Sequence, residues 1–376
     1  MARRRKVLSV VGTRPNMMKI APIAAELGRR AHEFEHVLVH TGQHYDRDMS
    51  EIFLEELGVG EPDYSLGVGS GSHAQQTAAV MERLEPVLLE AEPDVVLVPG
   101  DVNSTLAAAL TAAKLLLPIG HVEAGLRSFD RTMPEEINRI VADQFSRLLF
   151  IHSPEARDNL LAEGCPEAGI HDVGNTMIDS LVAMRDRIDA AAAPEKHGLS
   201  AGEYLVVTLH RPALVDGPLL AEAMSQLAAL SEALPIVFPV HPRTRAALEA
   251  LAIDLDDDRL KLLDPIGYVE FLSLVASSAG VLTDSGGIQE ETTYLGLPCF
   301  TLRSNTERPV TVSMGTNTLL GLDPARIAEV PSLLEAARKK EARIPPLWDG
   351  KASERIADVL ASALDEPVEQ LGQALG

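Results

Sequence analysis

Three acidic side chains lie in the segments that connect short apolar runs to the helices expected after them, and carboxyl groups at such positions could transfer protons. They are Asp101, Glu123 and Glu135. Because consecutive strand–helix loops of a parallel sheet meet at one edge, we expect the three groups to lie close together. Crowded carboxyl groups raise one another's pKa, which prepares a general acid and a general base near neutral pH. A structural alternative exists, since an aspartate often caps a helix and a glutamate often occupies its first turn.

A glycine turn with two cations follows the first apolar run. Gly12 leads into Arg14, and Lys19 comes shortly afterwards. The N–H groups and the dipole at the start of a helix attract phosphate, and the two cations would add charge beside it. Two solvated cations in an ordinary loop explain the pattern equally well.

A second glycine turn, Ser285-Gly286-Gly287, is the strongest single signal in the chain. Its two glycines would let the backbone approach a phosphate at the start of a helix. Glu291 follows one turn later and could accept hydrogen bonds from sugar hydroxyls, and Arg308 could pair with a diphosphate. A tight turn with a structural arginine is the less favoured interpretation.

Two histidines end apolar runs in the second half of the chain. His210 and His241 could bind phosphate or transfer a proton there, or could be satisfied structural residues. The spaced histidines His36, His40 and His44 do not share a helix face, so they are weak candidates for a metal site. The sequence predicts no metal and no cofactor.

The elements that must position these residues alternate between short β-branched runs and longer Ala/Leu/Glu segments. This alternation predicts an α/β fold with doubly wound parallel sheets. The pattern restarts after a polar stretch, so we predict Rossmann-like domains at 1–185 and 190–351. An amphipathic helix begins the C-terminal segment 352–376. It is expected to complete the first domain, although its pattern alone also allows it to cap the second.

Composition excludes several classes of partner. The chain has 376 residues, with 33 Lys+Arg against 55 Asp+Glu and a formal charge of −22, which disfavours nucleic acid and anionic membranes as partners. Two cysteines exclude a disulfide framework. The apolar run after the basic N-terminus is too short for a signal peptide, so we expect a cytoplasmic protein.

Ordered motifs along nearly the whole chain resemble the UDP-N-acetylglucosamine 2-epimerase family. They are GTRPNMMKIAP (12–22), TGQH (41–44), GDVNST (100–105), HVEAGLRSFDRTMPEEINR (121–139), VGNTMID (173–179), LTDSGGIQEET (282–292) and TERP (306–309). The resemblance implies the GT-B architecture, with two Rossmann-like domains facing an interdomain cleft. It also implies a homodimer.

The resemblance implies that UDP-GlcNAc and UDP-ManNAc are interconverted without a redox cofactor. The C2 proton of the sugar is poorly acidic, so the expected route is elimination of UDP to 2-acetamidoglucal and re-addition from the other face. Such a route needs an acid/base pair and a stabilised diphosphate leaving group.

The resemblance also assigns roles to residues. It implies acid/base work for Asp101, Glu123 and Glu135, and diphosphate binding for His210. Substrate contacts are implied for Arg14, Lys19, Phe271, Ser285, Gly286, Gly287, Glu291 and Arg308. Some relatives carry an allosteric UDP-GlcNAc site, for which Gln43, His44, Arg211 and His241 remain here. Tyr45-Asp46 replace the usual pair of that site, and Pro212 separately departs from the HRREN motif of many relatives, so the resemblance leaves allosteric activation open.

Three other functions use the same clusters. A hydrolysing epimerase would release ManNAc and UDP, and a GT-B glycosyltransferase would need an acceptor groove that the sequence does not identify. A non-catalytic nucleotide-sugar sensor is disfavoured because all three carboxylates are present.

Overall fold

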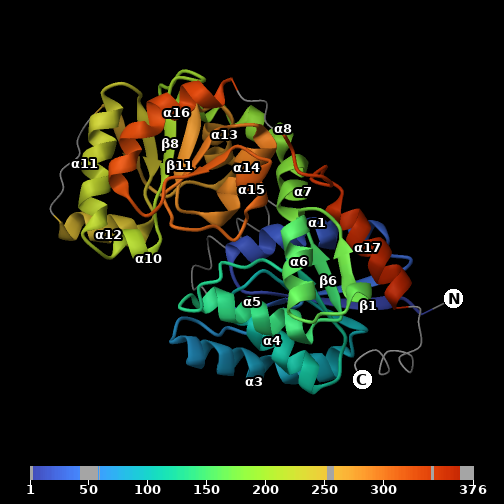
Figure 1. The fold of residues 1–376 in the computed structure, drawn as a ribbon. Helices are drawn as coiled ribbons and strands as arrows, with labels where there is room; N and C mark the ends of the chain where they lie inside the picture. Colours follow the sequence, from blue (N-terminus) through green and yellow to red (C-terminus); the bar gives the residue numbers. More distant parts are fainter. Residues whose placement is uncertain (1–2, 43–57, 59, 252–257, 340–342, 365–376) are drawn as a thin grey trace. The chain divides into compact units, whose positions relative to one another are not determined.

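The computed structural model describes residues 3–42, 58, 60–251, 258–339 and 343–364. The chain divides into two compact units. Unit 1 runs to Ala183 and resumes at Pro346, and unit 2 is Met184–Pro345 (Figure 1). Within the described residues, no helix is both long and apolar enough to span a membrane.

Unit 1 is built on a parallel sheet in the order β3-β2-β1-β4-β5-β6-β7. The chain runs outward from β1 in one direction and from β4 in the other, so the order reverses between these two neighbours. Ligands of doubly wound folds bind at such a reversal, outside the carboxyl ends of the strands. The strands are β1 (Arg5–Val11), β2 (Phe34–His40), β3 (Tyr64–Ser65), β4 (Val95–Pro99), β5 (Ile119–Val122), β6 (Leu148–Ile151) and β7 (Ile170–Asp172).

Helices cover the sheet of unit 1. On one side α3, α4 and α5 pack in a row, and α1, α7 and α17 contact one another (Figure 1). The helices are α1 (Arg14–Arg29), α3 (His73–Ala91), α4 (Asn103–Lys114), α5 (Pro134–Phe145), α6 (Pro154–Ala162), the 3-10 turn η1 (Glu167–Gly169), α7 (Thr176–Ala183) and α17 (Ala352–Ala363).

Unit 2 repeats the plan with a parallel sheet in the order β10-β9-β8-β11-β12-β13. Its reversal lies between β8 and β11. The strands are β8 (Leu205–Thr208), β9 (Ile236–Pro239), β10 (Leu260–Leu263), β11 (Gly280–Thr283), β12 (Cys299–Thr301) and β13 (Asn317–Leu319). The helices are α8 (Arg185–Ala190), α9 (Ala193–Lys196), α10 (Pro212–Val215), α11 (Leu219–Ser231), α12 (Pro242–Ala250), α13 (Tyr268–Ala276), α14 (Gly286–Leu295), α15 (Val310–Ser313), η2 (Pro324–Glu329) and α16 (Val330–Ala337).

The central strands are apolar because both of their faces are covered. Every residue of β4 is buried, as is every residue of β5 and β6. Continuous apolar runs of this kind are typical of parallel sheets between two helix layers. In α4 the alanines Ala107, Ala108 and Ala109 are fully buried, and their small side chains let the helix pack closely.

The first helix begins earlier than its apolar spacing suggests. The sequence pattern places its start at Lys19, whereas α1 begins at Arg14. Pro15 stands in the first turn, where a missing N–H costs nothing. Lys19 therefore projects from the second turn of a helix rather than from a loop.

The C-terminal segment packs against unit 1. Helix α17 contacts α1 and α7 (Figure 1), and the carboxylate of Asp179 accepts hydrogen bonds from the backbone N–H groups of Ala352 at 3.1 Å and Ser353 at 2.7 Å. These N–H groups have no partner within the helix, so Asp179 caps it from a distance in sequence. Gly174, at φ 86°, packs against the backbone of Leu347.

Candidate functional site

A buried ion pair in unit 1 joins helix α1 to the loop that follows β5. Lys19 is 6 % exposed and Glu123 7 % exposed, and the Lys19 ammonium donates to the Glu123 carboxylate. Glu123 itself has φ 72°, a left-handed conformation that costs energy in a residue other than glycine. Gly100 leaves the space for this pair, because a Cβ there would lie 2.8 Å from Lys19 Nζ.

The Asp101 loop is held by side chains from four elements. Asn16 Nδ2 donates to the carbonyl of Pro99 at 2.8 Å, and so does Thr105 Oγ1 at 2.7 Å. The next two carbonyls, of Gly100 and Asp101, face His121 Nε2 at 2.7 Å and Asn138 Nδ2 at 2.8 Å. The side chain of Asp101 pairs with Arg139 at 2.5 Å. The loop is therefore pre-organised, with the Asp101 carboxylate partly open and partnered by a cation.

A buried charge network supports the same edge. His121 Nδ1 lies 2.6 Å from Asp143, whose other oxygen contacts Arg127 at 2.7 Å and the Gly125 N–H at 3.1 Å. Burial alone would raise the pKa of Asp143, but His121 and Arg127 outweigh it and hold that pKa below its usual range. Arg127 also pairs with Glu163 at 2.6 Å.

The two neighbouring glutamates of α5 have different surroundings. Glu136 is buried, and its carboxylate accepts from the N–H groups of Ser128 at 2.9 Å and Phe129 at 2.8 Å and pairs with Arg139 at 2.8 Å. Glu135, the residue that the sequence singles out, is only half-buried in the first helical turn. Glu136 therefore fixes the preceding loop, and Glu135 is the more accessible of the two.

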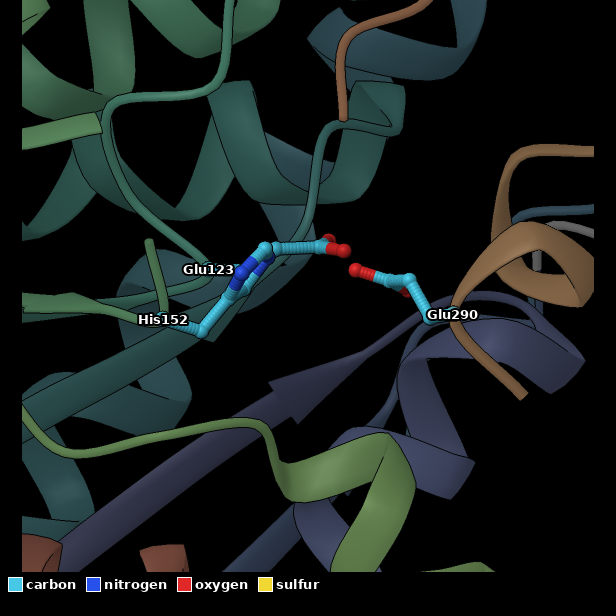
Figure 2. Close-up of side chains that lie close together, drawn as sticks. All are labelled: Glu123, His152 and Glu290. Atoms are coloured by element: carbon cyan, nitrogen blue, oxygen red, sulfur yellow. The ribbon is translucent and has the colours of Figure 1, made fainter. Parts of the chain in front are cut away.

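A small cavity of about 10 Å³ adjoins Glu123, which we call the Glu123 cavity. Its lining is Lys19, Val122, Glu123, Phe150, His152, Val173, Gly174, Asn175 and Thr176, all in unit 1. A carboxylate oxygen of Glu123 and a ring nitrogen of His152 lie within 4.8 Å of each other (Figure 2). A titratable ring thus lies beside the carboxylate that pairs with Lys19.

In unit 2, His210 and Asp284 join the two strands at the reversal. His210 Nδ1 lies 3.0 Å from one oxygen of Asp284, and the other oxygen accepts from the N–H groups of His210 at 2.8 Å and Arg211 at 2.7 Å. Burial opposes ionisation of Asp284, but His210 and these N–H groups outweigh it and lower its pKa. The His210 ring is held in place by this carboxylate.

The Ser285-Gly286-Gly287 turn forms the start of α14, with Ser285 as its N-cap. The guanidinium of Arg308 packs against Gly286, where a Cβ would meet Nη1 at 2.6 Å. Arg308 is buried and ion-paired with Glu290 at 3.1 Å. The turn therefore combines helix N–H groups with an arginine whose charge a neighbouring carboxylate balances.

The two remaining predicted substrate residues of unit 2, Glu291 and Phe271, lie on helices. Glu291 is buried in α14 and accepts a hydrogen bond from Tyr268 Oη at 2.7 Å. Phe271 is half-buried on α13. The phenol of Tyr268 therefore fixes the Glu291 carboxylate, and no sequence motif indicates this contact.

Two residues of the suggested second site, Arg211 and His241, lie next to His210 in unit 2. Arg211 donates from Nε to the carbonyl of Asp284 at 3.0 Å, and His241 is exposed with its ring 5.7 Å from that of His210. Gln43 and His44 lie outside the described residues. In unit 1 Arg14 is exposed, in contrast to the buried Lys19 on the same helix.

Several residues that support the site had no predicted role. His121, Asn138, His152 and Tyr268 all contact or adjoin a predicted site residue. His121 offered a usable signal, because a histidine inside an otherwise apolar, fully buried strand needs a partner. The others lie in helices or loops, where nothing in the local pattern indicates their contacts.

Two Rossmann-like units, each built on a doubly wound parallel sheet, define the GT-B class of fold. A galactosyltransferase of the lipopolysaccharide outer core shares this fold, at a TM-score of 0.54 and 14% identity over 95% of this chain and 99% of its own. The model of the family described as UDP-N-acetylglucosamine 2-epimerase matches residues 26–361. The chain belongs to that family.

Close relatives support the assignment. The UDP-N-acetylglucosamine 2-epimerase of Methanococcus maripaludis is 40% identical over 94% of this chain and 98% of its own. The UDP-2,3-diacetamido-2,3-dideoxy-D-glucuronate 2-epimerase of Pseudomonas aeruginosa is 41% identical over 95% of this chain and 99% of its own. A crystal structure of the Methanocaldococcus jannaschii UDP-GlcNAc 2-epimerase, in complex with UDP-GlcNAc and UDP, has a TM-score of 0.84 and 38% identity over 95% of this chain and 99% of that one.

Proposed function

We propose that the chain catalyses the reversible C2 epimerisation of UDP-GlcNAc to UDP-ManNAc. The observation that carries this proposal is the arrangement of Glu123 and Asp101, two neighbouring loop carboxylates that each have their own cation, Lys19 or Arg139. A general base must begin the reaction ionised, and a cation beside a carboxylate favours the ionised form. The relatives that share nearly the whole length of the chain act on UDP-linked 2-acetamido sugars, as their names state.

The reaction needs proton transfer on both faces of the sugar ring. Breaking the C1–O bond gives the sugar oxocarbenium character, which acidifies the C2 proton, and a carboxylate removes that proton. UDP and 2-acetamidoglucal result. Protonation at C2 from the opposite face and return of the UDP oxygen to C1 then give the epimer. Atoms and charges balance with no redox step.

Within this proposal, unit 1 supplies proton transfer. Asp101, Glu123 and Glu135 are the acid/base groups, with Arg14 and Lys19 as substrate-site cations. Asp101 and Glu123 follow successive strands, and Glu135 opens the helix after the second of them. The support is positional: their loops leave the carboxyl edge of one sheet, and the Asp101 loop is clamped by three consecutive carbonyl contacts.

Unit 2 holds the leaving group in the same proposal. The N-terminus of α14 and the Ser285-Gly286-Gly287 turn bind the diphosphate, with His210 as a hydrogen-bond donor and Arg308 beside the turn. Glu291 binds the ribose hydroxyls and Phe271 lies near the uracil. The 10-residue length of α14 provides a full helix dipole at the phosphate.

Incubation with UDP-GlcNAc in D2O, followed by proton NMR, tests the function. We expect UDP-ManNAc with deuterium at C2, and deuterium in the recovered UDP-GlcNAc. Accumulation of free ManNAc with UDP would instead establish the hydrolysing reaction. Tight UDP binding without turnover of any 2-acetamido sugar would contradict an enzymatic role.

The sugar class needs its own test, because the Pseudomonas relative named for a diacetamido glucuronate is as similar as the UDP-GlcNAc relatives. Comparing kcat/KM for UDP-GlcNAc and UDP-2,3-diacetamido-2,3-dideoxy-D-glucuronate decides it. We expect UDP-GlcNAc to be preferred. A higher value for the glucuronate would move the assignment to the latter substrate.

We further propose a cytoplasmic homodimer. Both cysteines, Cys165 and Cys299, are free and buried, which suits a reducing compartment. Light scattering after size exclusion should give twice the 40.4 kDa chain mass. A monomer mass at micromolar concentration would contradict the dimer, and recovery outside the cytoplasmic fraction of cells would contradict the compartment.

A further inference from the structure

We propose that His152 is the proton-relay partner of Glu123, acting through one water molecule bound in the Glu123 cavity. The inference rests on the proposed function only for its catalytic consequence. The relay would carry a proton between the carboxyl group and the imidazole, and His152 would not touch the sugar.

The Glu123 cavity has the size and the lining of a water site. Its volume of about 10 Å³ is that of roughly one water, and a buried water usually makes two to four hydrogen bonds. Glu123, His152 and Asn175 can supply them. Asn175 is 3 % exposed, its Oδ1 accepts from the Met177 N–H at 2.9 Å, and its Nδ2 is buried with no hydrogen-bond partner among the described residues. A water in the cavity would satisfy that N–H group.

The His152 ring is placed by the C-terminal segment. Trp348 Nε1 donates to the His152 carbonyl at 2.9 Å, and the two rings meet edge to face with centroids 5.8 Å apart. Trp348 is 2 % exposed and His152 is 4 % exposed. The ring is therefore held beside the cavity by packing, at a distance from Glu123 that one water can bridge.

A two-base epimerase needs such a relay. The group that removes the C2 proton ends the step protonated, while the group on the other face ends it deprotonated. Both must be reset before the next turnover in the same direction. The protonated Glu123 would pass its proton to the water, which passes one to a ring nitrogen of His152. The products are the Glu123 carboxylate and the His152 imidazolium, and no electrons change hands.

Charged groups of both signs surround the His152 ring. Glu123 lies across the cavity, and Asp172 at the end of β7 is close enough to feel the charge of the ring. Lys19, on α1, opposes a second positive charge but is already paired with Glu123. Arg157 and Arg355 also act on Asp172, so the His152 ring lies among charges of both signs.

Trp348 reports the titration directly, because it is the only tryptophan in the chain. A protonated imidazole in contact with indole quenches its fluorescence. We expect one step in emission against pH, absent in His152→Asn and His152→Gln. Glu123→Gln should move the midpoint to lower pH, because a negative neighbour of the imidazolium is lost. His171→Asn is the control, since that ring lies 6.0 Å from Phe150 and outside the lining of the cavity. It should leave the step unchanged.

Persistence of the step in both His152 variants, or an unchanged midpoint in Glu123→Gln, would overturn the proposal. Because this measurement needs no turnover, it stays decisive even if the epimerase assignment fails. An unshifted emission maximum of Trp348 in each variant verifies that the fold is intact.

Enzyme kinetics provide a second test of the relay. His152→Gln should lower kcat about ten-fold, at the low end of the effects of proton-transfer groups, with KM within about two-fold. The acidic limb of the wild-type pH profile, where a protonated His152 ring cannot accept a further proton, should be absent, and added imidazole should restore part of the rate in His152→Asn. Wild-type kcat with an unchanged pH profile in both variants would overturn the relay.

Discussion

His121 Nε2 lies 2.7 Å from the carbonyl oxygen of Gly100, so the strand before Glu123 holds the backbone of the loop that presents Asp101. The other ring nitrogen faces the Asp143 carboxylate at 2.6 Å. A carbonyl and an ionised carboxylate both only accept, so both ring nitrogens donate. His121 is fully buried. We therefore predict that His121 is an imidazolium that links the Asp101 loop to the Asp143–Arg127 network.

Replacing His121 by Asn should break this link. The change leaves Asp143 buried without one of its two cationic partners, and we expect a loss of about 3 kcal/mol in the free energy of unfolding. Urea denaturation followed by Trp348 fluorescence measures it.

His36 provides the matched control. Burial lowers the pKa of His36 to about 4, so its ring is neutral at pH 7, and it makes one hydrogen bond, to Ser9 Oγ at 2.9 Å. His36→Asn should cost only about 1 kcal/mol. Equal losses in the two variants would contradict a charged His121, as would the absence of two ring N–H proton signals in NMR spectra.

Substitution of the two adjacent glutamates of α5 should have different effects: one change should lower activity and the other should lower stability. Glu135→Gln should lower kcat at least about 100-fold and change the free energy of unfolding by less than about 0.5 kcal/mol. Glu136→Gln should cost about 2 kcal/mol, because a buried carboxylate that binds Arg139 and the Ser128 and Phe129 N–H groups loses its charge. Paired kinetics and denaturation distinguish them, and a reversed pattern would move the acid/base role to Glu136.

Gly174 should tolerate no side chain. Its φ of 86° is left-handed, and a Cβ would lie 2.0 Å from the Leu347 carbonyl oxygen, which cannot withdraw without moving the Trp348 segment. Gly174→Ala should therefore cost at least about 3 kcal/mol. Gly164→Ala is the matched control, with φ 84° but open space around the Cβ, and should cost about 1 kcal/mol from backbone strain alone. A similar loss in both, measured by urea denaturation, would refute the clash.

Asp284 should make unit 2 sensitive to acid. Its folded-state pKa lies below the unfolded value, so its stabilisation is complete above about pH 4 and is lost as the pH falls through the folded pKa. Asp284→Asn should lower the free energy of unfolding by about 1–2 kcal/mol at pH 7 and flatten its decline between about pH 4 and 2. Circular dichroism in urea at several pH values checks this. An unchanged pH slope would show that the carboxylate is not preferentially ionised in the folded state.

The main elements could be predicted because their signals are local. Strands such as β4 are apolar throughout because both faces are buried, and helices such as α3 carry apolar residues at helical spacing. The glycine turn at Ser285–Gly287 begins a helix as predicted. The start of α1 was misplaced by five residues, because Arg14-Pro15 carries no apolar periodicity although it suits a first helical turn.

What the sequence by itself determined is the set of loops that carry chemistry, since a loop after an apolar strand must lie at the carboxyl edge of a parallel sheet. Tertiary structure alone decided which side chains in those loops are buried and which partners they have. It buried Glu136 rather than Glu135, set His121 between Gly100 and Asp143, and brought Trp348 to His152 across 196 residues of chain. Contacts between residues so far apart depend on the packing of whole elements, and no local pattern of residue types encodes them.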